Sequence, residues 1–157
     1  MTGRRMVLRS VVVLALLGTS AGWLLAQGFG SPRQYYSPWQ KHPKHNYHFR
    51  RYYFKPNVGF AGYRHHYVIH HPGRPKHAFF FNPYKKAYWG RCELDSKGKA
   101  EYSMLPEEHR KGTLAEIPES AFPKPSPVPP IPESDDDIPM DLPPDDLPSE
   151  ADLAPAA

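Results

Sequence analysis

The feature that most constrains this chain is an aromatic stretch at 77–94, which has the sequence HAFFFNPYKKAYWGRCEL. Its two aromatic runs flank Asn82-Pro83, a dipeptide that initiates turns. Aromatic side chains favour the pleated, half-buried surface of a strand. The sequence therefore predicts a β-hairpin at 77–94, around which the rest of the fold assembles.

Alternation along a strand assigns the two faces of this hairpin. Phe79 and Phe81 should share one face, with Phe80 on the other. On the return strand, Trp89 falls on the same side as the charged Arg91, which predicts a partly exposed face. The alternative is that Trp89 belongs to the core.

Further short strands are predicted on both sides of the hairpin, separated by proline, glycine or asparagine clusters. A turn cluster at 95–98 precedes the last of them, and Pro106 with two glutamates favours a helical turn at 105–111. The expected fold class is mainly β: a small antiparallel meander of four to five short strands within residues 47–112. The predicted strands are Tyr47–Lys55, His66–His70, Ala78–Phe81, Ala87–Leu94 and Ala100–Met104.

The first 26 residues have the composition of an export signal. Arginines precede an apolar run at 11–17, and the small residues that follow suit cleavage after Ala21 or Ala26. An uncleaved membrane anchor over 10–26 is the alternative, at the lower length limit for a span. The pair Arg4-Arg5 also partly matches the twin-arginine export pattern. We therefore expect an exported protein that is periplasmic, bound at the cell surface or secreted.

The charge of the chain changes sign along its length. Residues 27–112 carry 16 lysines and arginines against 5 acids, a net charge of +11. Residues 113–157 carry 1 lysine against 11 acids, a net charge of −10, and hold 12 of the 20 prolines. An acidic, proline-rich segment such as 113–157 buries too little apolar area to offset its conformational entropy. We therefore expect a basic, histidine- and proline-rich linker at 27–46 and a disordered tail at 113–157.

The acidic tail has two features of its own. Acidic-apolar-proline units recur at 137–139, 141–143 and 146–148, and this near-repeat is either low complexity or a recognition tract. The opposite charges of the two regions also predict that the tail folds back loosely on the basic domain. There it would compete with external polyanions.

Cations interleaved with aromatic residues make the basic domain a candidate polyanion-binding module. Cations neutralise the charge of a polymer, and rings stack on its bases or sugars. The expected ligands are an anionic polysaccharide, lipid headgroups or nucleic acid. The alternative is that the rings form the core and the cations its solvated face. The candidate residues are Arg50, Arg51, Lys55, Arg64, Lys85, Lys86, Trp89 and Arg91.

Eight of the nine histidines lie between His42 and His77, and imidazole is a common metal ligand. The spacings of zinc-binding motifs are absent, and the lysines and arginines nearby would repel a cation. The sequence therefore predicts no dedicated metal site and no cofactor. The weak candidates for metal binding are His42, His45, His48, His66 and His70.

Signatures of catalysis are also absent from the sequence. It contains neither a G-x-S-x-G elbow nor a glycine-rich phosphate loop, and residues 27–112 hold only five acids. Cys92 is the one cysteine, so it cannot form an intramolecular disulfide and should be buried. We expect a protein that is not an enzyme.

The hairpin resembles the aromatic hairpins of WW-type and OCRE-type modules, which place tyrosines beside an Asn-Pro or Asp-Pro turn. The similar stretch is short and lacks the second tryptophan and the closing proline of a WW domain. Trp89-Gly90-Arg91 is similar to the WGR domain in three letters only. More broadly, the chain resembles uncharacterised exported bacterial proteins that combine an FFFNP…YWGR hairpin with an acidic, proline-rich end. These resemblances imply no activity.

The sequence thus predicts an exported, non-enzymatic structural or interaction module at the cell envelope. A polyanion-binding module is the second hypothesis, and a histidine-based metal binder is the third. The expected partners are an anionic envelope polymer or another envelope protein, together with the chain's own acidic tail. The membrane is a further partner if the N-terminal segment stays uncleaved.

Overall fold

The computed structural model describes residues 30–94, 101–144 and 146–148. The export segment predicted at 1–26 and the turn cluster at 95–98 lie outside these ranges. The described residues from Pro32 onward belong to one compact unit. Within the described residues, no helix is long and apolar enough to cross a membrane.

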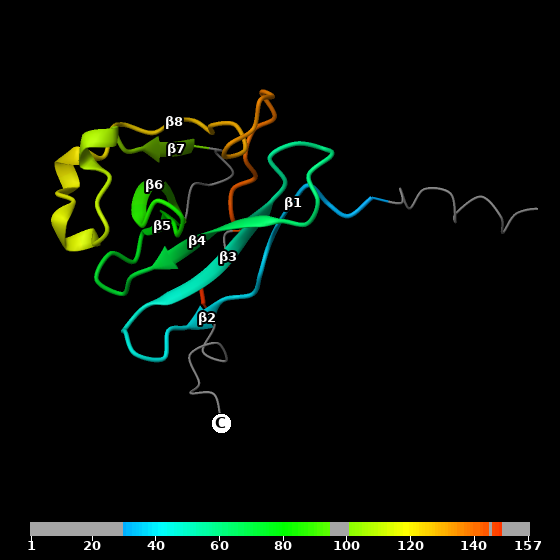
Figure 1. Cartoon of the computed structure of the whole chain (residues 1–157). Coiled ribbons are helices and arrows are strands. Elements are labelled where there is room, and N and C mark those ends of the chain that lie inside the picture. The colour runs from blue at the N-terminus through cyan, green and yellow to red at the C-terminus, as the bar shows by residue number, and fades with distance from the viewer. Residues whose placement is uncertain (1–29, 95–100, 145, 149–157) are drawn as a thin grey trace, which may run out of the picture. The chain divides into compact units, whose positions relative to one another are not determined.

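The architecture is a curled antiparallel sheet with three short 3-10 turns between β7 and β8 (Figure 1). The strand order is β1-β3-β4-β5-β6-β7-β8, and β2 pairs with β3 beside β1. The 3-10 turns span Glu107–His109, Leu114–Glu116 and Glu119–Ala121. The strands are β1 Gln34–Tyr36, β2 Gln40–Lys41, β3 His48–Phe54, β4 Arg64–His70, β5 His77–Asn82, β6 Ala87–Glu93, β7 Glu101–Met104 and β8 Ser126–Pro127.

The prediction of a mainly β, antiparallel fold is confirmed, but the predicted number of strands is too low. The five predicted strands correspond to β3 through β7. The three additional strands, β1, β2 and β8, have two or three residues each. They lie in the regions that composition assigned to a linker and a tail. Two or three residues are too few to show the alternation by which a strand is recognised in a sequence. These strands form because they pair with β3 and β7.

The hairpin of β5 and β6 closes as its Asn-Pro sequence predicts. The Asn82 side-chain oxygen accepts hydrogen bonds from the backbone N–H groups of Tyr84 (2.9 Å) and Lys85 (3.1 Å). Lys86 then adopts a left-handed conformation with φ of 53°, which turns the chain into β6. Asparagine favours such turns because its amide bonds the backbone two residues further on.

A β-bulge at Trp89 changes the faces predicted for β6. Phe80 pairs with Gly90, whereas Phe81 pairs with Tyr88, so Trp89 is the extra residue. Its partly buried ring packs against the hydrophobic core, with its centroid 5.3 Å from that of Phe80. The simple alternation that placed Trp89 on the face of Arg91 is therefore wrong, because the bulge shifts the register by one residue.

The core has two parts, one on each side of the sheet. We call the side that carries Tyr52, Val68 and Phe80 the inner face, and the side that carries Phe49 and Tyr67 the outer face. Each lies on alternate strand positions, and Phe79 and Phe81 fall on the outer face as predicted. The outer face at β5 and β6 packs against three residues of the segment that follows β7: Leu105, Ile117 and Phe122.

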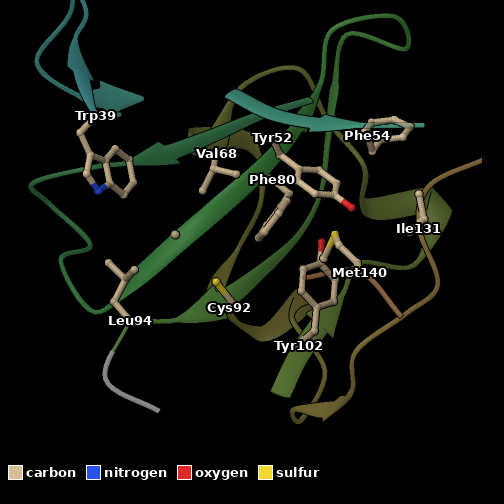
Figure 2. Close-up of a cluster of buried hydrophobic side chains, with 11 residues drawn as sticks. Trp39, Tyr52, Phe54, Val68, Phe80, Cys92, Leu94, Tyr102, Ile131 and Met140 are labelled. Atoms are coloured by element: carbon tan, nitrogen blue, oxygen red, sulfur yellow. The ribbon is translucent and has the colours of Figure 1, made fainter. Parts of the chain in front are cut away.

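The inner face packs against the C-terminal region, as Figure 2 shows for Ile131 and Met140. Ile131 is 2% exposed and Met140 is 3% exposed. Cys92 is buried in the same cluster, as the sequence predicted. Several described residues after 113 thus pack against the sheet, which corrects the expectation of a disordered tail for 113–144 and 146–148; residue 145 and residues 149–157 lie outside the described ranges. Composition did not predict this packing, because it averages over the whole region. A few apolar side chains and ion pairs with the basic sheet are enough to hold the region in place.

Candidate functional site

The outer face of β1, β3 and β4 carries a row of aromatic and basic side chains that is only partly buried. On β3, Phe49, Arg51 and Tyr53 alternate with fully buried residues, since every second side chain points away from the inner face. The row continues across both neighbouring strands and the loop before β4. We call this row the aromatic face; it comprises Tyr35, Phe49, Arg51, Tyr53, Lys55, Tyr63, His65 and Tyr67.

The rings of the aromatic face form a continuous platform. Tyr35 and Tyr53 are stacked, with centroids 4.8 Å apart and planes at 17°. Tyr63 packs edge-on against Tyr35 at 5.0 Å. His65 joins the two ends of the row, because its centroid lies 5.9 Å from Tyr53 and 5.3 Å from Tyr67. Such offset and edge-on contacts are the favoured geometries of aromatic pairs, so the platform is well defined.

Cations lie over this platform. The Arg51 guanidinium is 5.7 Å from the ring centroids of both Phe49 and Tyr67. The Lys55 ammonium lies 5.0 Å from the ring of Tyr63. Arg51 forms no ion pair with any acid in the described part of the chain. Its charge is therefore available to an anionic ligand.

Histidine contributes little charge to the aromatic face. Burial, and then the positive charge of Arg51, lower the pKa of His65 below its usual value of 6.5. The ring is therefore mainly neutral at pH 7 and acts as an aromatic contact. The positive charge of the face resides on Arg51 and Lys55.

A cleft of about 350 Å³ continues the aromatic face toward the start of β6. Arg51 lies at its border, and the Tyr88 hydroxyl lies 3.3 Å from the Nε2 atom of His71 beside it. The described lining contains cationic, aromatic and aliphatic side chains but no carboxylate. The lining residues are His42, Tyr47, Phe49, Arg51, Tyr67, Ile69, Phe81, Tyr88 and Gly112.

The structure does not bring the eight predicted polyanion-binding residues together. Arg51 and Lys55 belong to the aromatic face, whereas Trp89 is partly buried against the core on the other side of the sheet. Lys85 and Lys86 are exposed in the hairpin turn. The other three each pair with an acid of the C-terminal region: Arg50 with Asp146, Arg64 with Glu133, and Arg91 with Glu119.

The five histidines named as weak metal candidates are also dispersed. The rings of His42 and His45 are 4.7 Å apart near β2, whereas His66 is buried in the core between Phe54 and Trp89. His48 and His70 occupy paired positions on β3 and β4. In the ranges that the structure covers, no group of three or more histidine, cysteine or acidic side chains is arranged to hold a metal ion.

No protein-family model, curated protein or solved structure matches this chain. The candidate site therefore depends on its own geometry. Tyr35, Phe49, Tyr63 and Tyr67 were not among the candidate residues from the sequence. The alternation of Phe49, Arg51 and Tyr53 along one strand was the signal that could have identified them.

Proposed function

We propose that the protein is an exported, non-enzymatic interaction module that binds an anionic polysaccharide of the cell envelope through the aromatic face. The observation that carries this proposal is Arg51, a cation without an acidic partner in the described chain, held over the edge-on ring pair of Phe49 and Tyr67 within the aromatic face. The acids of the C-terminal region pair instead with arginines elsewhere.

The chemistry of the face suits an acidic sugar polymer. The C–H faces of a sugar ring pack on aromatic rings, and a uronate carboxylate accepts charge-assisted hydrogen bonds from a guanidinium. Four of the rings are tyrosines, whose hydroxyl groups offer partners to sugar hydroxyls.

The cleft supports binding over catalysis. Glycoside hydrolysis requires two carboxyl groups on either side of the scissile bond. The described residues that line the cleft include none; its polar side chains are Arg51, His42 and three tyrosines. The proposal of a non-enzymatic module rests on this lining.

Binding can be tested with polygalacturonate as the probe and calorimetry as the measurement. We expect Arg51→Ala to weaken binding roughly tenfold, since one charge-assisted contact is lost. Lys124→Ala is the matched control, because it removes one exposed positive charge from a different segment. The affinity of the wild type should also fall as salt rises, and neutral dextran should not bind.

Two results would contradict the proposal. Equal affinities of the Arg51→Ala and Lys124→Ala variants would show that the aromatic face does not hold the polymer. Tighter binding of single-stranded oligothymidylate than of polygalacturonate would assign the face to nucleic acid instead. Circular dichroism of both variants confirms that they are folded.

A further inference from the structure

The inner side of β1 to β3 holds part of the C-terminal region in the manner of a bound peptide. We call residues 136–144 and 146–148 the docked segment. Its main-chain carbonyls and its acids are held by side chains that lie about 100 positions earlier in the sequence. We call these side chains the peptide groove; they are Arg33, Gln34, Tyr36, Trp39 and Arg50.

Gln34 contacts the main chain of the docked segment twice. Its Oε1 atom accepts a hydrogen bond from the Asp141 N–H (2.9 Å), and its Nε2 donates to the Pro139 carbonyl (3.2 Å). The Tyr52 hydroxyl donates to the same Oε1 atom, which fixes the orientation of the amide. The Tyr36 hydroxyl donates to the Asp141 carbonyl at 2.6 Å. These contacts bind an extended backbone whatever its side chains are.

Two arginines hold acids at the two ends of the segment. Arg50 donates to both carboxylate oxygens of Asp146, at 2.8 and 3.4 Å, and the Trp39 indole donates to the Asp146 carbonyl at 2.7 Å. Arg33 pairs with Asp136 at 2.6 Å, and this contact lowers the pKa of that carboxyl below its usual range.

Both arginines are positioned by the domain itself. The Arg50 side chain is 5% exposed; it donates to the Ser37 carbonyl and lies 4.8 Å from the Trp39 ring. Arg33 donates to the carbonyls of Lys55 and Pro56. A guanidinium held in place in this way loses little entropy when it meets a carboxylate, so the groove is preorganised for acidic ligands.

The prolines of the docked segment explain why side chains hold it. Proline lacks the N–H that a strand needs, so a segment rich in proline pairs poorly with a sheet edge. In the described chain its one β-bridge joins Pro139 to Pro130, which also lies in the C-terminal region. Met140 is buried in the core and Leu142 packs against it, so apolar pockets add to the main-chain contacts.

We propose that the peptide groove is a recognition site for extended acidic peptides with Asp-Leu-Pro units, and that the docked segment occupies it as an exchangeable internal ligand. The fitting partner is an acidic, proline-containing segment of another protein. Asp-Leu-Pro occurs at 141–143 and again at 146–148, and the acids of the segment match the two fixed arginines. This site is independent of the aromatic face.

A tethered segment competes strongly with a separate peptide, because its effective concentration reaches the millimolar range. The test therefore uses the full chain with the substitutions Asp136→Arg and Asp146→Arg, which repel the segment from Arg33 and Arg50. Both acids lie on the surface, at side-chain exposures of 40% and 55%, so the substitutions themselves introduce no charge into the core. The probe is a fluorescein-labelled synthetic peptide with the wild-type sequence of 136–148, and its anisotropy is measured.

We expect the doubly substituted protein to bind this peptide saturably, at least tenfold more tightly than the wild-type protein does. A peptide with the same two Asp→Arg changes is the matched control, and its affinity should be at least tenfold lower. Adding Tyr36→Phe to the protein removes only a hydroxyl and should weaken binding further. Hydrogen exchange at the amides of Met140 and Asp141 should become faster in the doubly substituted protein.

Absence of saturable binding up to about 1 mM peptide would overturn the proposal. Equal binding of the wild-type and charge-reversed peptides would also overturn it, because the arginines would then select nothing. If the two amides stay protected and the peptide does not bind, the segment is a permanent part of the fold. That result overturns the proposal as well, and it leaves polygalacturonate binding to the aromatic face unaffected.

Discussion

Acidification should destabilise the protein through the buried ring of His66. This side chain is 2% exposed, and neither of its ring nitrogens has a hydrogen-bond partner among the described residues. Its ring packs against Phe54 at 5.1 Å and Trp89 at 5.5 Å. Burial lowers its pKa from 6.5 to about 3, and the nearby charges of His65, Arg64 and Lys85 act in the same direction. In the folded protein, His66 is therefore neutral above about pH 3.

The magnitude follows from the difference between the two pKa values. In the unfolded chain His66 takes up a proton below pH 6.5, whereas the folded protein excludes that proton until about pH 3. Its full contribution to stability is therefore present above pH 6.5 and is lost as the pH falls toward 3. Between pH 6.5 and 4.5 the loss is roughly 2 kcal/mol of unfolding free energy, since the slope rises toward about 1.4 kcal/mol per pH unit as the unfolded chain becomes fully protonated.

Urea unfolding followed by circular dichroism at pH 7.5, 6.5, 5.5 and 4.5 measures this loss. His66→Leu removes the titrating ring at similar volume, so its unfolding free energy should fall less steeply with acid than that of the wild type. The difference between the two slopes isolates His66 from the other histidines. His65→Leu is the matched control on the opposite face of β4; its ring is partly exposed, so it should flatten the profile less. Parallel profiles for wild type and His66→Leu would refute the argument.

Two pairs of substitutions, each a buried position with an exposed or open control, test the packing. Gly90→Ala should cost about 3 kcal/mol in urea unfolding, because a Cβ there would lie 2.0 Å from the hydroxyl of the fully buried Tyr102; Gly73→Ala, with nothing within 4 Å, should change stability by less than about 1 kcal/mol. Ile131→Ala should also cost about 3 kcal/mol, whereas Ile138→Ala, at a 45% exposed position, should cost under about 0.5 kcal/mol. Equal effects of either pair would contradict the packing described.

The central strands could be predicted because their signals are local. Alternation within β3 and the Asn-Pro turn at Asn82 depend on residues only a few positions apart. The bulge at Trp89 could not be predicted in this way. It accommodates contacts with Phe80 and Tyr102, which come from two other strands, and period-two alternation carries no information about them.

The packing of the C-terminal region could not be predicted from composition. Averaged over the region, hydrophobicity is low and proline content is high, and both favour disorder. The structure instead depends on individual matches, such as Ile131 in the core and Asp146 on Arg50. Partners separated by 96 residues leave no local pattern. The opposite net charges of the two regions were the one sequence signal that suggested contact.

The candidate site was predicted in part. Its chemistry, cations among aromatic rings, follows from the composition of β3, and Arg51 and Lys55 were named in advance. The sequence could not show which cations face acids of the same chain. Arg50 and Arg51 are adjacent in the sequence, yet alternation places them on opposite faces, where only Arg50 meets an acid.

The arrangement of the strands also bears on self-association. The most apolar strand, β5, lies in the middle of the sheet order, whereas the two ends are β1 and β8 with three and two residues. Long exposed edges are templates on which further chains add strands and form fibrils. Pro127 in β8 has no N–H to offer such a chain. The phenylalanine triplet of β5 is thus shielded from intermolecular pairing for as long as the edges stay in place.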